Sequence, residues 1–196
     1  MDAPKLKELV LQALEHERGG VSVYETAVRC AVTDELKEEW KKYLKQTRRH
    51  VTILEDLCKS LRIDRTEKSV GAGIVAGLGR ALVSAMQAAL AAGDPQAAEL
   101  VACECVVLAE TKDHLDWELL SACGKAGKGA EARALTAAAE EVEEQEDEHL
   151  YHSRGWCREL WRQSLGLKAV LPPPEEKKHV TTAIGAARAE QAAHPK

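Results

Sequence analysis

The sequence predicts an all-α protein, a bundle of long helices connected as antiparallel hairpins. Ala, Glu, Leu and Lys dominate its 196 residues, Phe is absent, and proline is scarce before residue 172. This composition favours long helices, because most of these residues have high helix propensity and because proline interrupts helices. Apolar residues also recur at steps of three and four in several long stretches, the spacing of one face of an amphipathic helix.

The length is typical of one domain that is large enough to bury a hydrophobic core. We expect this domain to span residues 1–168. Three successive prolines at positions 172–174 stop regular structure, so residues 169–196 are expected to form a polar tail that is mobile or loosely docked. The tail has a weak helical pattern near residues 182–193.

Composition and charge exclude several classes of function. The formal net charge of -5 argues against a general nucleic-acid-binding protein, which would carry a basic face. The six cysteines are scattered and form no CxxC pair, which indicates reduced thiols. The N-terminal residues lack the apolar segment of a signal peptide, and we therefore expect a cytoplasmic protein.

One apolar stretch, residues 70–92, has the length of a membrane span. Arg80 falls near its centre, where a charge costs about 2.5–3.5 kcal/mol on insertion, and most of its other residues are the weakly inserting Ala and Gly. We therefore expect no membrane contact, and we interpret the stretch as a buried helix that crosses between two hairpins.

The apolar spacing and the cap residues together predict five helices. Their expected ranges are 4–31, 34–61, 67–92, 95–123 and 130–165. Thr33 and Asp34 offer an N-cap for the second helix, and Gly124 is expected to end the fourth. Short links within the first pair and within the last pair predict two antiparallel hairpins.

Four of these helices carry polar residues in the middle of an apolar seam. Because a buried charge is costly unless a partner compensates it, these positions are candidates for a binding site. They are Glu17, Thr47, His50, Glu110, His114, Glu146 and His149. The spacing of three between Glu146 and His149 places both on one helix face, close enough to hold the same metal ion.

The two halves of the chain repeat this polar pattern in the same order. In the first and fourth helices a glutamate is followed seven residues later by an aromatic residue: Glu17 by Tyr24, and Glu110 by Trp117. Residues 46–50 read Gln-Thr-Arg-Arg-His, and residues 145–149 read Gln-Glu-Asp-Glu-His. Two such hairpins, related by an approximate two-fold axis, would direct glutamates and histidines to the centre of a bundle, where divalent ions would neutralise the carboxylates.

With these motifs the sequence resembles the ferritin-like superfamily, and it looks most like the bacterial stress-associated proteins of the YciE/YciF type. The resemblance covers roughly residues 5–165, including the additional helix between the hairpins. It implies a ferritin-like antiparallel four-helix bundle with a crossover helix, which binds iron or manganese, acts on oxygen or peroxide in a stress response, and forms a homodimer. The ligands that the resemblance implies are Glu17, His50, Glu110, Glu146 and His149.

The chain departs from the family pattern at Thr47, where a glutamate is expected. Three arrangements therefore remain open: one tight metal site, an unequal pair of sites, or a site no longer in use. His114, one helical turn after Glu110, is either a replacement ligand or a hydrogen-bond partner of a ligand. Tyr24 and Trp117 are either ordinary core aromatics or electron relays beside an oxidising site.

A different class of function is also compatible with the sequence. In this alternative the chain is a metal-free descendant of a ferritin-like protein, a helical scaffold or interaction protein whose inherited polar residues hydrogen-bond one another. Thr47 favours this hypothesis, which predicts that removing Glu17 or Glu110 alters stability but no activity. Haem held between facing helices is a weaker third hypothesis, because no Met or His pair is symmetrically placed on its own.

Overall fold

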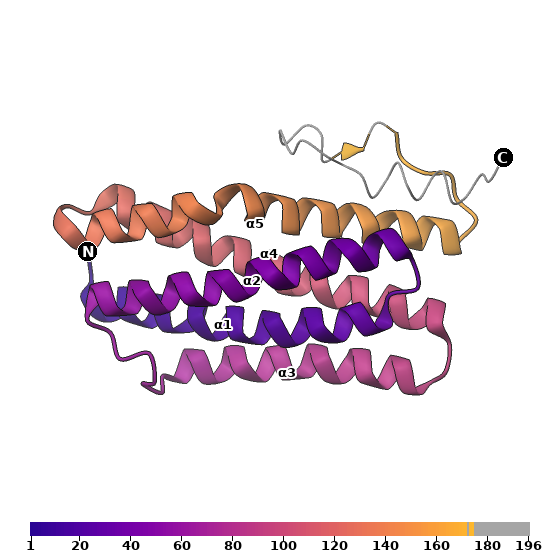
Figure 1. The fold of residues 1–196 in the computed structure, drawn as a ribbon, viewed down its shortest axis with the longest axis horizontal. Helices are drawn as coiled ribbons and strands as arrows, with labels where there is room; N and C mark the ends of the chain where they lie inside the picture. The colour runs from indigo at the N-terminus through magenta and orange to yellow at the C-terminus, as the bar shows by residue number, and fades with distance from the viewer. Residues whose placement is uncertain (172, 175–196) are drawn as a thin grey trace.

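The computed structural model describes residues 1–171, 173 and 174, and it contains five helices within them. They are α1 (Ala3–Cys30), α2 (Asp34–Leu61), α3 (Val70–Ala91), α4 (Pro95–Ala126) and α5 (Gly129–Ser164), shown in Figure 1. The described part of the chain has no strand, so the predicted all-α class is confirmed. The helical pattern expected at residues 182–193 lies outside the described residues, as does most of the expected tail.

Four of the helices form a closed ring of contacts. α1 packs against α2 and α4, and α5 packs against the same two helices. In Figure 1 the two helices of each of these four pairs run antiparallel. α3 lies outside the ring against α1 and α4, and because it runs back along the bundle, α2 and α4 point in the same direction.

Buried apolar residues form two separate clusters along the bundle. One cluster contains Tyr24 and Trp40, and the other contains Leu14 and Leu54. On each of the four ring helices, buried polar residues lie between the part that belongs to one cluster and the part that belongs to the other. The bundle is therefore held together by two apolar layers, where each large buried side chain contributes about 1.5–3 kcal/mol, and it has a polar layer between them.

The apolar stretch at residues 70–92 differs from the prediction of a buried helix. In α3, Val75 and Met86 are buried, whereas Val70, Ile74 and Leu78 are largely exposed. The reason is that α3 has neighbours on one side only, and its outer face is left without a covering element among the described residues. Among the described helices, α3 alone is long and apolar enough to cross a membrane.

The expected end of the fourth helix at Gly124 is wrong, because α4 continues to Ala126 and Gly127 caps it. Gly124 is buried inside the helix against α5. A Cβ atom at this position would lie 2.5 Å from Thr136 Oγ1 and 2.8 Å from its backbone nitrogen. This glycine therefore permits a close approach of α4 to α5 and does not terminate the helix.

The turn between α1 and α2 is fixed by a carboxylate that belongs to α4. Thr33 is the N-cap residue of α2, but its side chain makes no capping hydrogen bond. Instead, buried Glu99 accepts hydrogen bonds from the backbone nitrogens of Val32 (2.7 Å) and Thr33 (2.6 Å), and from the Thr33 hydroxyl (3.0 Å). Glu99 thus joins the first hairpin to the second, because it satisfies backbone donors that the turn leaves unpaired.

We predict that Glu99→Ala lowers the free energy of unfolding by about 1–3 kcal/mol, since it leaves three partly buried donors without their charged acceptor. Urea denaturation of the purified variant and of the wild type measures this loss. Glu104→Ala removes an exposed glutamate from the same helix and is expected to change stability by less than about 0.5 kcal/mol. Equal losses in the two variants would contradict the proposed role of Glu99.

Candidate metal centre

The polar layer contains all five residues that the resemblance proposes as metal ligands. α1 contributes Glu17, α2 contributes His50, α4 contributes Glu110, and α5 contributes both Glu146 and His149. None of these residues is more than 3% exposed. The spacing along four helices has therefore brought carboxylates and imidazoles from both halves of the chain into one water-excluded place.

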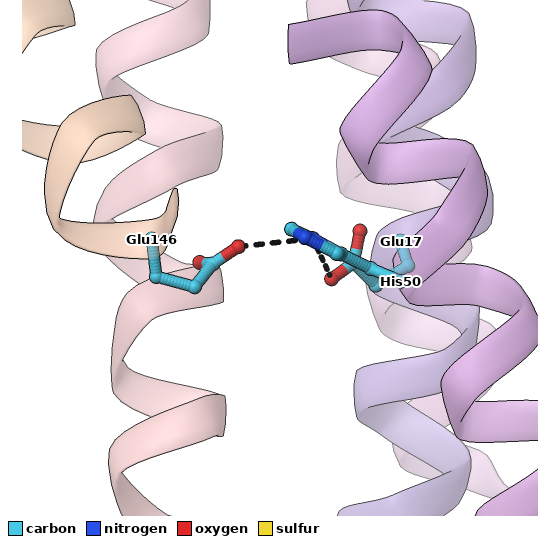
Figure 2. A group of neighbouring side chains, drawn as sticks. All are labelled: Glu17, His50 and Glu146. Carbon is cyan, nitrogen blue, oxygen red and sulfur yellow. Dashed lines mark ion pairs between the residues drawn. The ribbon is translucent and has the colours of Figure 1, made fainter. Parts of the chain in front are cut away.

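His50 lies between two carboxylates from different helices, as Figure 2 shows. Its Nδ1 atom is 3.2 Å from Glu17 Oε1 and 3.1 Å from Glu146 Oε1. One ligand atom from each of these three residues lies within 4.8 Å of the other two, a spacing that would suit a shared metal ion.

His149 has a similar environment in the second half of the layer. Its Nδ1 atom is 3.5 Å from Glu110 Oε2 and 3.8 Å from Glu146 Oε1. The two imidazole rings stack with their centroids 5.6 Å apart. Glu146 is therefore shared, because it approaches both histidines and lies between the two halves.

The far nitrogen of each imidazole is bound by a glutamine of the opposite half. His50 Nε2 lies 3.0 Å from Gln145 Oε1, and His149 Nε2 lies 3.0 Å from Gln46 Oε1. A carboxamide oxygen accepts, so the Nε2 atoms are the donors and the Nδ1 atoms face the carboxylates. This orientation of a histidine, with one nitrogen held by an outer acceptor and the other turned inward, is typical of metal ligands.

Several buried atoms of the layer have no hydrogen-bond partner among the described residues. They are Glu17 Oε2, both carboxylate oxygens of Glu146, Glu110 Oε2, Asp113 Oδ1, and Nδ1 of His50 and of His149. An unpaired buried polar atom costs about 1–3 kcal/mol, and a charged one costs more. The layer consequently holds a set of oxygen and nitrogen ligands whose natural complement is a cation.

The pKa values show how the layer balances its charge without a metal ion. Burial lowers the pKa of His50, but the charge of Glu17 and the contact with Glu146 outweigh it and raise this pKa to about 11. Burial and the charge of Glu17 raise the pKa of Glu146, despite its contact with His50. For Glu110, burial favours protonation, yet the neighbouring His149 outweighs this effect and the pKa falls below its ordinary value. At neutral pH, His50 therefore carries a proton that acts as the internal cation.

Asp113 is a member of the site that the sequence analysis did not identify. It is 4% exposed, and one of its oxygens lies within 4.8 Å of ligand atoms from Glu110 and Glu146. Burial, followed by the charge of Glu17, raises its pKa well above the ordinary value. Its position three residues after Glu110 is the signal that identifies it, because that spacing returns to the same face of a helix.

The remaining residues that the sequence singled out surround the layer. Trp117 Nε1 donates to Glu17 Oε1 at 2.8 Å, and the buried ring of Tyr24 packs edge-on to His149 with centroids 6.0 Å apart. Thr47 is buried and contacts α1, since a Cβ on Gly20 would lie 3.3 Å from its methyl group. These three residues therefore line the site and support it from the side.

His114 lies at the edge of the layer and does not face its centre. Its Nε2 atom is 2.8 Å from Asp147 Oδ1, and its side chain is 15% exposed. The sequence left two roles open for His114, a replacement ligand or a hydrogen-bond partner of a ligand. In the structure its contacts are with Asp147 and Glu118, and it does not contact the central carboxylates. Its place instead is between solvent and the buried ligands.

A largely buried carboxylate, Glu39, binds the aromatic side chains at one end of the layer, and the sequence did not identify it either. Glu39 accepts hydrogen bonds from Tyr43 (2.6 Å) and Trp156 (2.6 Å), and it lies 2.8 Å from His152 Nδ1. Tyr43 in turn packs on His149 with ring centroids 4.3 Å apart. Glu39 therefore fixes the ring that limits the movement of one candidate ligand.

Comparisons with models of protein families, with curated proteins and with solved structures found no match to the chain. The interpretation of the polar layer accordingly rests on its own geometry and chemistry.

We predict that Asp113→Asn stabilises the metal-free protein at pH 7. In the wild type the folded state holds a proton on Asp113 that the unfolded state releases above its ordinary pKa, so stability falls as pH rises towards the raised pKa. The variant has no such proton to lose. The difference in free energy of unfolding between variant and wild type should therefore grow by about 1.4 kcal/mol per pH unit between the ordinary and the raised pKa of Asp113.

Urea denaturation in the presence of a chelator, repeated between pH 5 and pH 8, measures the effect. Glu104→Gln, on the exposed side of the same helix, serves as the control and should show no such trend. A variant that is less stable than the wild type throughout this range would contradict the interpretation of Asp113 as a strained buried acid.

Proposed function

We propose that this chain is a metal-binding helical bundle of the ferritin-like kind, which holds iron or manganese in its polar layer. The observation that carries the proposal is the orientation of the two imidazoles. Each turns Nδ1 towards buried carboxylates and gives Nε2 to a glutamine of the opposite half. Core histidines without a ligand role have no need of this paired arrangement, whereas metal ligands do.

The residues divide into two unequal sets around one shared carboxylate. Glu17 and His50 would serve one ion, Glu110, Asp113 and His149 would serve the other, and Glu146 would lie between them. Mixed oxygen and nitrogen ligands of this kind suit divalent iron and manganese. The first set has fewer carboxylates, so we propose one tighter and one weaker position.

An iron or manganese ion in this layer would supply one-electron chemistry towards oxygen or peroxide. The chain itself contributes ligand atoms, the exclusion of water and control of a proton. His50 holds that proton on Nδ1 in the metal-free state, and metal binding must displace it. Binding should therefore release protons, and affinity should increase with pH.

The connection of the helices supports the ferritin-like assignment. Two antiparallel hairpins are joined by a crossover segment that returns along the outside of the bundle, so the second and fourth helices run in parallel. Inward-facing candidate ligands on all four ring helices agree with metal centres built in the core of such bundles. Roles in a stress response and in the cytoplasm, and a homodimeric state, are part of the same proposal.

A metal-free scaffold is the second candidate, and one observation favours it. The raised pKa of His50 means that the layer already contains a positive charge that pairs Glu17 with Glu146. Under this hypothesis, removal of the carboxylates changes stability alone and added metal has no effect on the protein.

We predict that chelator-treated wild-type protein binds Fe(II) or Mn(II) at the polar layer with release of protons. At a free-metal concentration of 100 times Kd, linkage gives about 2.7 kcal/mol of added stability, or roughly a 5–10 °C rise in Tm. Calorimetry in buffers of different ionisation enthalpy detects the protons, and thermal unfolding detects the stabilisation.

The matched variants for this experiment lie close together on α5. Glu146→Ala should abolish the rise in Tm, whereas Glu144→Ala, which removes an exposed neighbour, should preserve it. Absence of any rise in the wild type would support the metal-free scaffold.

We also predict that Thr47→Glu strengthens metal binding, because it restores a carboxylate to the half that has fewer of them. Thr47 is 2% exposed and is spaced three residues before His50 on the same face of α2. A tenfold decrease in Kd corresponds to about 1.4 kcal/mol and is the size of effect expected. Thr47→Gln is the matched control, since glutamine has nearly the same shape as glutamate but no charge. Equal affinities in the two variants would contradict the proposed geometry.

A further inference from the structure

We propose that the space between α4 and α5 is the route by which divalent cations reach the polar layer from solvent. The inference rests on the proposed metal site and concerns how that site is filled. A cavity of about 430 Å³ opens between these two helices, and its walls include His114, Trp117, Asp147 and Glu146. It therefore extends from exposed side chains to a residue of the candidate centre.

The acidic and histidine side chains of this cavity form a gradient of burial. Glu118 is 63% exposed, Asp147 is 40%, His114 is 15%, and Glu146 is 2%. A cation that follows them moves from hydrated carboxylates to one that water does not reach. Such a series allows a metal ion to exchange its water molecules stepwise for protein ligands.

His114 lies between the exposed and the buried carboxylates of this route. Its Nε2 atom lies 2.8 Å from Asp147 Oδ1, and its Nδ1 atom lies 3.8 Å from Glu118 Oε1. The ring also packs edge-on to Tyr151 with centroids 6.0 Å apart. An imidazole between two carboxylates would bind a cation transiently. Its affinity would be lower than that of the buried centre, so the ion would move on inward.

The inner end of the cavity has a ligand that is ready to receive a cation. Both carboxylate oxygens of Glu146 are buried: Oε1 faces Nδ1 of His50 at 3.1 Å, and Oε2 has no hydrogen-bond partner in the described part of the chain. Trp117, on the facing wall, donates to Glu17 and so connects the cavity to the other half of the layer. This buried Oε2 atom without a partner, at the floor of the cavity, distinguishes the cavity from an ordinary acidic groove.

Charge favours cations along this route. Glu118, Glu143, Asp147 and Glu146 line the cavity, and Lys125 is the one Lys or Arg side chain among its lining residues. A cleft lined mainly by one sign of charge concentrates ions of the opposite sign and raises association rates by 10-fold or more. In contrast, the groove between α1, α3 and α4 is lined mostly by glycine, alanine, valine and leucine residues together with His16 and Lys112, and it offers a cation no carboxylate.

The test measures the rate at which chelator-treated protein takes up Co(II), followed by its visible absorption in a stopped-flow instrument. In the double variant E143Q/D147N, we expect uptake at low ionic strength to be about 3- to 10-fold slower, with a smaller difference in high salt. The matched control is E140Q/E144Q, which removes two charges at the same spacing from exposed positions of α5 that do not line the cavity. The control should load at nearly the wild-type rate.

A second variant, Ser121→Trp, places a bulky side chain in the cavity wall and leaves the buried ligands unchanged. Uptake and release of Co(II) should slow by the same factor, so that Kd is unchanged. Wild-type protein that binds no Co(II) would overturn the proposed function itself. If the wild-type protein binds Co(II) but E143Q/D147N and Ser121→Trp both take it up at the wild-type rate, the proposed route is wrong and the metal site is not. Equal slowing in E140Q/E144Q and E143Q/D147N would also contradict the route.

Discussion

The structure depends on neutralising several carboxylates that the fold buries in one layer. Glu17, Glu110, Asp113 and Glu146 are all almost fully buried, and water cannot solvate them there. Protein interiors tolerate such groups when they are protonated, paired or bound to a cation. The chain uses the first two solutions in its metal-free state, since the pKa of Asp113 is raised and His50 carries a proton. A metal ion would replace both with one strong interaction.

The rest of the fold maintains this costly layer. Two apolar clusters, one on each side along the bundle, supply the burial that offsets it. Gln46 and Gln145 hold the imidazoles from the far side, Glu39 fixes the Tyr43 ring that packs on His149, and Trp117 donates to Glu17. Except for the bond between Glu39 and Tyr43, each of these contacts joins two different helices, so the four helices must keep their register for the ligands to stay aligned.

The sequence was most informative where residues broke a regular pattern. Glu17, Glu110 and Glu146 were recognisable because a charge interrupted an apolar seam, and the seams also predicted the five helices. Asp113 was missed because it stands among other charged residues of the fourth helix, although its spacing of three from Glu110 places it on the same face. The exposure of α3 and the close packing at Gly124 depend on which helices become neighbours, and such contacts are not encoded in the spacing of a single helix.

The approximate repeat explains where the strongest binding should occur. When Glu17 is aligned with Glu110, Gly20 corresponds to Asp113, and Thr47 corresponds to Glu146 in the paired helices. In the first half these two small residues lie close together, since a Cβ added at Gly20 would be 3.3 Å from Thr47 Cγ2, and this close packing stands where the second half has carboxylates. Negative charge is therefore concentrated on α4 and α5, which are also the helices that border the acidic cavity. An ion arriving between α4 and α5 would meet the richer set of ligands first, and the poorer set would fill only after it.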